Sequence, residues 1–325
     1  MAIADESVTG VDDFTARKVA ARCERALVVA NVVGNLPTPL DKVAEAAGIL
    51  ETLDITDLPE EAEVARPTWL KRVIGAYAFK EKAVFIDRSQ TQGRTRFTQA
   101  HETVHAMLPW HDATYTFDDE AIFHDTQARL DAEANLGAGH LVFQGGGRFR
   151  ADAMNYQTRL ASAIALSERY AASAHATIRY FAIHHSEEVG LLVCGRFPQG
   201  IEGRLPVWFA AESQSFKRRF GEMRERVRAR GRNRYIDRTC EPILSIARAA
   251  LESGTVVADE ATLTDRGGKT VRVWLDAWFN QFNVFVMLSP RRRIRRGLRL
   301  TVNTGDEGEL AEVQLTGPRK RIHPQ

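Results

Sequence analysis

The segment "RFTQAHETVHAMLPWH", at residues 96–111, holds three of the nine histidines in a chain of 325 residues, together with one glutamate. Apolar side chains recur along it every three or four residues, as in an amphipathic helix: Phe97, Ala100, Val104 and Leu108. The segment predicts a packed helix that begins near Arg94 and ends before Pro109, because proline disrupts a helix interior.

Within this helix, His101, Glu102 and His105 form an H-E-x-x-H motif. Residues four apart lie one turn apart on the same helix face, so the two imidazoles can bind one metal ion. Neutral imidazole nitrogens suit zinc, and Glu102 can act as the base toward a water that the metal activates. The motif therefore predicts a zinc site with metalloprotease chemistry.

A catalytic zinc usually takes three protein ligands, so one more ligand is expected from outside the motif. The candidates further along the chain are His111, His124, Asp131, Glu133 and His140. Asp131 borders the apolar stripe of a helix predicted over residues 128–143, at the edge of the buried face, where a ligand belongs. Glu133 lies further from that stripe, as an ordinary exposed helix charge would. We predict Asp131 as the third ligand, with Glu133 as the alternative.

The second helix carries "DAEANLGAGHLVFQ" at residues 131–144. Together, the two helices resemble the ImmA/IrrE family of zinc metallopeptidases, and the resemblance covers roughly residues 10–150. It implies a zincin-like domain with a small sheet, in which His101, His105 and Asp131 hold Zn2+ and Glu102 is catalytic. The family usually has glutamate where this chain has Asp131, whose side chain is one methylene shorter. This departure keeps Glu133 open as the third ligand.

The resemblance continues in "ALSERYAASAHATIRYFA", residues 165–182, which looks like the helix-turn-helix-like segment of longer family members. Those members also carry a GAF-like sensor domain at the C-terminus. Family members are associated with cleaving helix-turn-helix repressors of the XRE type, often under stress. The resemblance thus implies a zinc-dependent endopeptidase that regulates transcription by cleaving a protein partner.

The family resemblance, together with the charge distribution, implies three domains. Residues 1–150 form the metallopeptidase-like domain, 151–188 a helical segment of helix-turn-helix type, and 189–325 a basic α+β domain. The first domain has 16 Lys and Arg residues against 23 Asp and Glu, whereas residues 151–325 have 28 against 19. An acidic front and a basic back suggest separate functional units.

Pattern alone predicts an α+β fold. Two β-rich runs at residues 73–79 and 83–87 predict a hairpin directly before the motif helix, and a polar loop is predicted over residues 111–127. Five strand-like runs after residue 190 predict an antiparallel sheet. Helices are predicted among these strands at residues 215–231 and 241–253.

Two basic segments support an alternative function. Residues 217–234 contain nine basic and two acidic side chains, and residues 289–297 contain five arginines. Such segments can bind nucleic acid phosphates, which would make the protein a non-catalytic, metal-containing regulator. Solvated surface is the commoner role of charge runs, and Phe220 is the only aromatic residue that interleaves these arginines and could stack on bases. The helix-turn-helix-like segment offers only His175 and Arg179 as long base-reading side chains.

The N-terminus has neither the basic start nor the apolar core of a signal peptide, and no apolar run is long enough to span a bilayer. We therefore expect a cytoplasmic protein with no membrane partner. The three cysteines lie far apart and predict buried free thiols. His184 and His185 end a predicted helix, where positive charge is favourable.

Overall fold

The structure, a computed structural model, describes residues 11–55, 75–117, 124–196, 204–230, 233–237 and 240–291, which form a mixed α+β fold. The first part contains α1 (Asp13–Val29), α2 (Leu40–Ala46), β1 (Glu51–Asp54), β2 (Gly75–Ala78), β3 (Ala83–Ile86), α4 (Gln92–Met107), α5 (Pro109–Phe117) and α6 (His124–Val142). Three helices follow: α7 (Gly145–Ala153), α8 (Leu160–Tyr170) and α9 (Ala174–His184).

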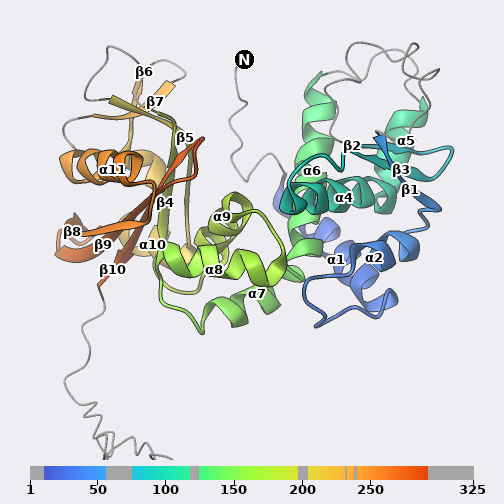
Figure 1. Cartoon of the computed structure of the whole chain (residues 1–325), viewed down its shortest axis with the longest axis horizontal. Helices are drawn as coiled ribbons and strands as arrows, with labels where there is room; N and C mark the ends of the chain where they lie inside the picture. The colour runs from blue at the N-terminus through green and yellow to red at the C-terminus, as the bar shows by residue number, and fades with distance from the viewer. Residues whose placement is uncertain are drawn as a thin grey trace, which may run out of the picture.

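The last part of the described chain alternates strands and helices. It contains β4 (Gly190–Cys194), β5 (Arg204–Glu212), α10 (Gln214–Phe220), a 3-10 turn (Met223–Arg226), β6 (Arg228–Arg230), β7 (Asn233–Asp237), α11 (Glu241–Ser253), β8 (Val257–Thr264), β9 (Thr270–Phe279) and β10 (Val284–Pro290). In Figure 1 these strands and α11 lie at the left, α7 to α9 lie in the middle, and α1 to α6 lie at the right.

A three-stranded sheet in the order β1-β3-β2 packs against α4. Strands β2 and β3 pair antiparallel, from Gly75 opposite Ile86 to Ala78 opposite Ala83, so the predicted hairpin is confirmed. Strand β1 joins the other side of β3 in parallel. This small sheet places strand β2 beside the helix that carries the H-E-x-x-H motif.

The larger sheet has seven antiparallel strands in the order β6-β7-β5-β4-β10-β9-β8. The antiparallel arrangement agrees with the prediction from the sequence. Side chains on successive strand residues point to opposite faces. On β4, Leu191 and Val193 therefore join a core with α8 and α9, while Leu192 and Cys194 join a second core with α10 and α11. The first core continues without a break through α6 and α4 to α1.

The polar loop predicted over residues 111–127 is wrong where the structure describes it. Helix α5 extends to Phe117, and α6 begins at His124. The reason is the first residue of α5: the fixed φ of proline favours the first turn of a helix, where its missing N–H is not needed. Pro109 thus ends one helix and begins the next, and Leu108 between them is extended, with ψ of 101°.

The helix predicted over residues 215–231 is also wrong beyond its first two turns. Helix α10 ends at Phe220, and Gly221 has a φ of +85° that breaks the helix. The chain then forms the 3-10 turn and pairs β6 with β7. The helix predicted over residues 241–253 is confirmed as α11.

Burial explains two further outcomes. Cys23 and Cys194 are buried free thiols, as predicted, while Cys240 is partly exposed. Burial also lowers the pKa of His184 to about 4, with smaller contributions from His140 and Arg150, so this side chain is neutral near pH 7. Among the described residues, no helix combines the length and apolar character needed to cross a membrane.

Candidate metal centre

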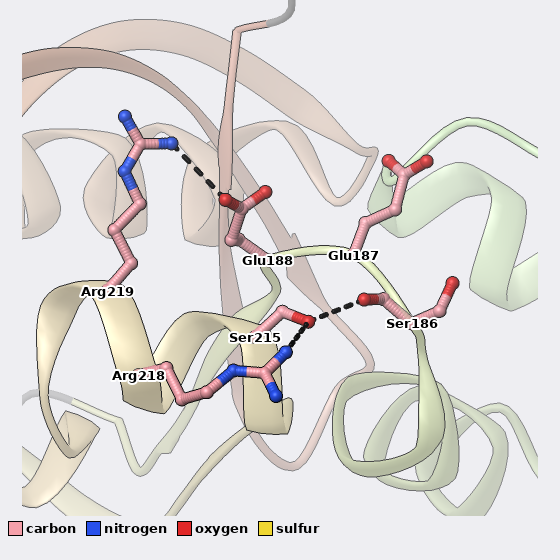
Figure 2. Close-up of a pocket in the computed structure, with 6 residues that line it drawn as sticks. All are labelled: Ser186, Glu187, Glu188, Ser215, Arg218 and Arg219. Atoms are coloured by element: carbon pink, nitrogen blue, oxygen red, sulfur yellow. Dashed lines mark hydrogen bonds and ion pairs between the residues drawn. The ribbon is translucent and has the colours of Figure 1, made fainter.

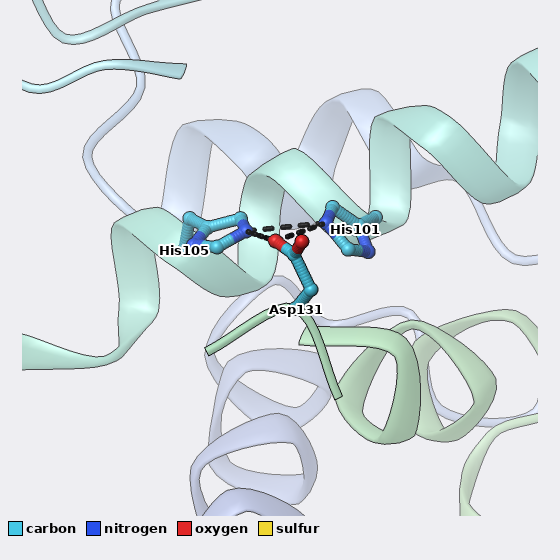
Figure 3. Close-up of side chains that lie close together, drawn as sticks. All are labelled: His101, His105 and Asp131. Carbon is cyan, nitrogen blue, oxygen red and sulfur yellow. Dashed lines mark hydrogen bonds and ion pairs between the residues drawn. The ribbon is translucent and has the colours of Figure 1, made fainter. Parts of the chain in front are cut away.

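Helices α4 and α6 bring the three predicted zinc ligands together. His101 and His105 lie one turn apart on α4, with their Nε2 atoms 3.1 Å apart. Asp131 on α6 places Oδ1 3.9 Å from Nε2 of His105 and 4.0 Å from Nε2 of His101. Figure 3 shows the three side chains converging, and their ligand atoms all lie within 4.8 Å of one another.

These donors fit zinc. Two imidazole nitrogens and one carboxylate oxygen are ligands that catalytic zinc sites use, and tetrahedral coordination places such donors about 3.4 Å apart. The observed separations of 3.1 to 4.0 Å lie on both sides of that value. Small side-chain rotations therefore suffice to hold the ion.

Close packing of α4 against α6 sets this geometry. A Cβ atom added to Gly137 on α6 would lie 2.7 Å from both methyl groups of Val104 on α4. Only glycine allows the two helix backbones to approach this far. Arg96 anchors α4 from another direction, because its Nη2 donates to the carbonyl of Thr38 at 2.7 Å.

A hydrogen bond orients the first imidazole. His101 Nδ1 lies 3.1 Å from Oδ1 of Asn135, one turn beyond Asp131 on α6. An amide oxygen only accepts, so Nδ1 of His101 carries the proton and Nε2 is left as the unprotonated, metal-facing nitrogen.

Both histidines are neutral. Burial lowers the pKa of His101 to about 4, opposed by its hydrogen bond to Asn135 and reinforced by His111. Burial lowers the pKa of His105 further, to about 2, with the neighbouring imidazoles of His101 and His111 adding to the effect. Since metal coordination requires unprotonated nitrogen, both side chains are in the correct state at neutral pH.

Glu102 is nearly buried, at 7% exposed. Burial raises its pKa to about 8, and the carboxylate of Asp131 contributes in the same direction. The side chain packs against strand β2, where a Cβ on Gly75 would lie 3.0 Å from Oε1 of Glu102 and 2.3 Å from Cγ2 of Thr98. A cation bound nearby would favour the carboxylate form, which is the form a general base requires.

Solvent reaches the centre from one side. The side chain of Asp131 is 44% exposed and that of His101 is 17% exposed, whereas that of His105 is only 6% exposed. The centre is therefore open to solvent past Asp131, while the His105 side is closed by protein.

Glu133 is not the exposed helix charge that the sequence predicted. It is 2% exposed, and its Oε2 accepts a hydrogen bond from Nε1 of Trp110 at 2.6 Å. The same oxygen lies 3.2 Å from Nε2 of His111. The carboxylate faces α5 and is absent from the ligand cluster, so the geometry favours Asp131 as the third ligand.

His111 contacts a predicted ligand and not the metal position, a role that the sequence did not predict. It is fully buried, and its Nδ1 lies 2.8 Å from Nδ1 of His105. The turn at Leu108 and Pro109 brings it back beneath α4. Its proximity to the motif was the available signal, but a predicted loop gave no reason to place it inside.

The other candidates do not join the cluster. His140 lies near Gly145 and Glu24, where burial lowers its pKa and Glu24 opposes the shift. The side chain of His124 lies outside the described part of the structure.

Much of the basic segment at residues 217–234 is used within the fold. Lys217 pairs with Glu222 at 2.6 Å, and Arg226 donates to the carbonyls of Phe220 and Thr264.

In the helix-turn-helix-like segment, the long side chain of Arg179 stacks on Phe209, with its guanidinium 4.0 Å from the ring centre.

His175 is likewise unsuited to reading bases. Its ring packs 5.2 Å from that of Phe285, against the larger sheet. The remaining part of the second basic segment, from residue 292 onward, lies outside the described residues.

Figure 2 shows a separate polar pocket of about 540 Å³, lined by Ser186, Glu187, Glu188, Ser215, Arg218 and Arg219. Arg219 pairs with Glu188 at 3.2 Å, and Arg218 donates to Ser215 at 3.2 Å. These six side chains include no histidine or cysteine and largely satisfy one another. The histidine cluster is therefore the better candidate for chemistry.

Neither a protein-family model nor a curated protein matches the chain. Among solved structures, the chain is similar to a Mycobacterium tuberculosis transcriptional regulator, with 14% sequence identity and a TM-score of 0.49. The similarity covers 83% of this chain and 76% of the regulator.

Proposed function

We propose that this protein is a zinc-dependent endopeptidase of the ImmA/IrrE type. The observation that carries the proposal is the convergence of His101, His105 and Asp131 within 4.8 Å, beside the buried carboxyl group of Glu102. A zincin-like organisation is supported by a small sheet that packs on the motif helix and by a second helix that contributes the third donor.

Each residue has a distinct role in the proposed reaction. His101, His105 and Asp131 would hold zinc, which supplies Lewis acidity at the scissile carbonyl and makes water a nucleophile near neutral pH. Glu102 would take the proton of the attacking water and deliver it to the leaving amine. Its burial against Gly75 keeps the carboxyl group in place between these two transfers.

We further propose that the substrate is a protein partner, such as a helix-turn-helix repressor of the XRE type, whose cleavage would relieve repression under stress. The resemblance of the two site helices to the ImmA/IrrE family supports this substrate class. The exposure of the centre on the Asp131 side suits an extended loop of a partner.

A matched set of variants tests the proposal. Wild-type protein loaded with zinc would be incubated with XRE-type repressors of the same genome, and fragments identified by intact mass. We expect Glu102→Gln to keep stoichiometric zinc and to lose cleavage by at least 100-fold, as removal of a general base predicts. Glu45→Gln, on the exposed face of α2, should cleave normally.

Two results would contradict the proposal: fragments formed at equal rates by the wild type and Glu102→Gln, or wild-type protein that binds no zinc. The alternative function, a nucleic-acid-binding regulator, predicts a salt-dependent shift of DNA by the purified protein that Glu102→Gln leaves unchanged. Measuring both properties on the same preparations separates the two functions.

A further inference from the structure

A chain of buried side chains extends from the closed side of the metal centre. His105 Nδ1 lies 2.8 Å from His111 Nδ1, and His111 Nε2 lies 3.2 Å from Glu133 Oε2. Trp110 Nε1 donates to the same oxygen at 2.6 Å. The chain thus links a predicted ligand on α4, a histidine at the start of α5 and a carboxylate on α6.

The hydrogen bonds in this chain can run in only one direction if His105 binds metal. Its Nε2 faces the nitrogen of His101 and the oxygen of Asp131, so Nδ1 must carry the proton. That proton is donated to Nδ1 of His111, which leaves the proton of His111 on Nε2. The Nε2 proton of His111 is then donated to Glu133.

Burial leaves His111 and Glu133 few alternative hydrogen-bond partners. His111 is fully buried and Glu133 is 2% exposed, so water does not compete for their hydrogen bonds. A buried polar group without a partner is strongly unfavourable, and every donor in this chain meets one acceptor. Arg129 Nε, 3.6 Å from Oε1 of Glu133, provides positive charge beside the carboxylate.

We propose that His111 and Glu133 are positioning residues that hold His105 in the tautomer with a free Nε2 and thereby raise its affinity for metal. Neither residue is a ligand, and the inference about affinity rests on the zinc site proposed above. Asn135 holds His101 in the same tautomer from the opposite side, so each histidine ligand has its own hydrogen-bond acceptor.

The first test measures zinc affinity of the full-length protein by competition with a chromogenic chelator. His111→Phe keeps a ring in the buried site but removes the acceptor, and should weaken zinc binding 10- to 100-fold. His111→Asn restores an acceptor near the position of Nδ1 and should recover most of the affinity. Trp110→Phe removes only a donor to Glu133 and should change affinity less than His111→Phe.

The second test does not depend on zinc. Nitrogen-15 NMR of histidine-labelled, metal-free protein should show His105 protonated at Nδ1 in the wild type, and should show loss of that single tautomer in His111→Phe and Glu133→Leu, which each remove an acceptor. Circular dichroism would verify that both variants fold.

The two tests distinguish failure of this inference from failure of the proposed function. Unchanged zinc affinity in a folded His111→Phe, with Asp131→Ala abolishing binding, would overturn the positioning role and leave the metal centre intact. A wild type that binds no zinc but shows the expected tautomer would refute the metal function and retain the hydrogen-bond chain. A mixture of tautomers in the wild type would overturn the inference directly.

Discussion

Glu102 makes the stability of the metal-free protein depend on pH in a defined direction. Burial raises its pKa from an ordinary 4.5 to about 8, so between these values the folded state retains a proton that the unfolded chain releases. A group with a raised pKa stabilises the fold at low pH, and this contribution is lost as pH rises toward 8. Glutamine, which does not titrate, has no such loss.

We therefore expect Glu102→Gln to become progressively more stable than the wild type between about pH 5 and pH 8, by about 1.4 kcal/mol per unit of effective pKa shift, and the difference should stay constant above that range. Urea unfolding in the presence of EDTA would measure this difference. Saturating zinc should reduce it, because a nearby cation favours the carboxylate. Parallel pH curves for the two proteins in EDTA would show that Glu102 is solvated in the folded state.

For individual residues, the sequence predicts which side chains share a face of one helix. His101 and His105 lie on one face because four residues make about one turn, and no other part of the chain is needed to infer it. The burial of Glu133 and His111 depends on the turn that returns α5 beneath α4. Only the packed molecule reveals that His111 faces His105 and that Glu133 faces His111, and that neither faces solvent.

The packing of helix α6 on α4 depends on a single small residue. A methyl group on Gly137 would lie 2.7 Å from both methyl groups of Val104, which is fully buried. Alanine improves helix propensity by about 1 kcal/mol, whereas overpacking costs about 1–3 kcal/mol. With two contacts below 3 Å, the steric term should be the larger.

We expect Gly137→Ala to lower the free energy of unfolding by about 1–2 kcal/mol and to weaken zinc binding, because Asp131 moves with α6. Gly147→Ala is the matched control: Gly147 lies on α7 with no atom within 4 Å of an added Cβ. This control should be neutral or slightly stabilising. Unchanged zinc affinity in Gly137→Ala would mean that α6 adjusts without displacing the ligand.

Helix α11 and the β2–β3 hairpin, whose signals are local, were predicted well, whereas strand β6, which forms by pairing with β7, was not. Helix α11 has a strong apolar stripe and a glycine at its C-terminus, and its predicted bounds agree with the structure. The basic segment after α10 has equally good helix formers, yet β6 forms there because β7 offers it a strand partner. Gly221 was the local signal that the helix stops.

At the scale of the whole molecule, an ion pair connects the start of helix α8 to strand β9 of the larger sheet. Asp276 on β9 is 2% exposed and accepts hydrogen bonds from Nη2 of Arg159 at 2.7 Å and from the backbone N–H of Leu160 at 2.9 Å. The second bond satisfies the first N–H of α8, a helix whose N-terminal residue provides no side-chain cap. The pair lies beside the core that runs on to the metal centre.

Because that core is continuous from the sheet to α4, the described chain should unfold as one cooperative unit. Removing one partner of a buried ion pair costs about 3–5 kcal/mol; since the side chain of Arg159 is 24% exposed, we expect Asp276→Asn to fall at the lower end, about 3 kcal/mol.

Hydrogen exchange measured by mass spectrometry would test whether this loss of stability extends from the larger sheet to α4 and α6. In Asp276→Asn, slow amides of α4 and α6 should exchange faster by the same factor as those of β4 and β10, although the substitution contacts neither α4 nor α6. Asp259→Asn, on the exposed face of β8, is the control and should leave both sets unchanged. Acceleration confined to the sheet and α8 would instead mean that the metal centre belongs to a separately folding unit, and that zinc binding stabilises that unit alone.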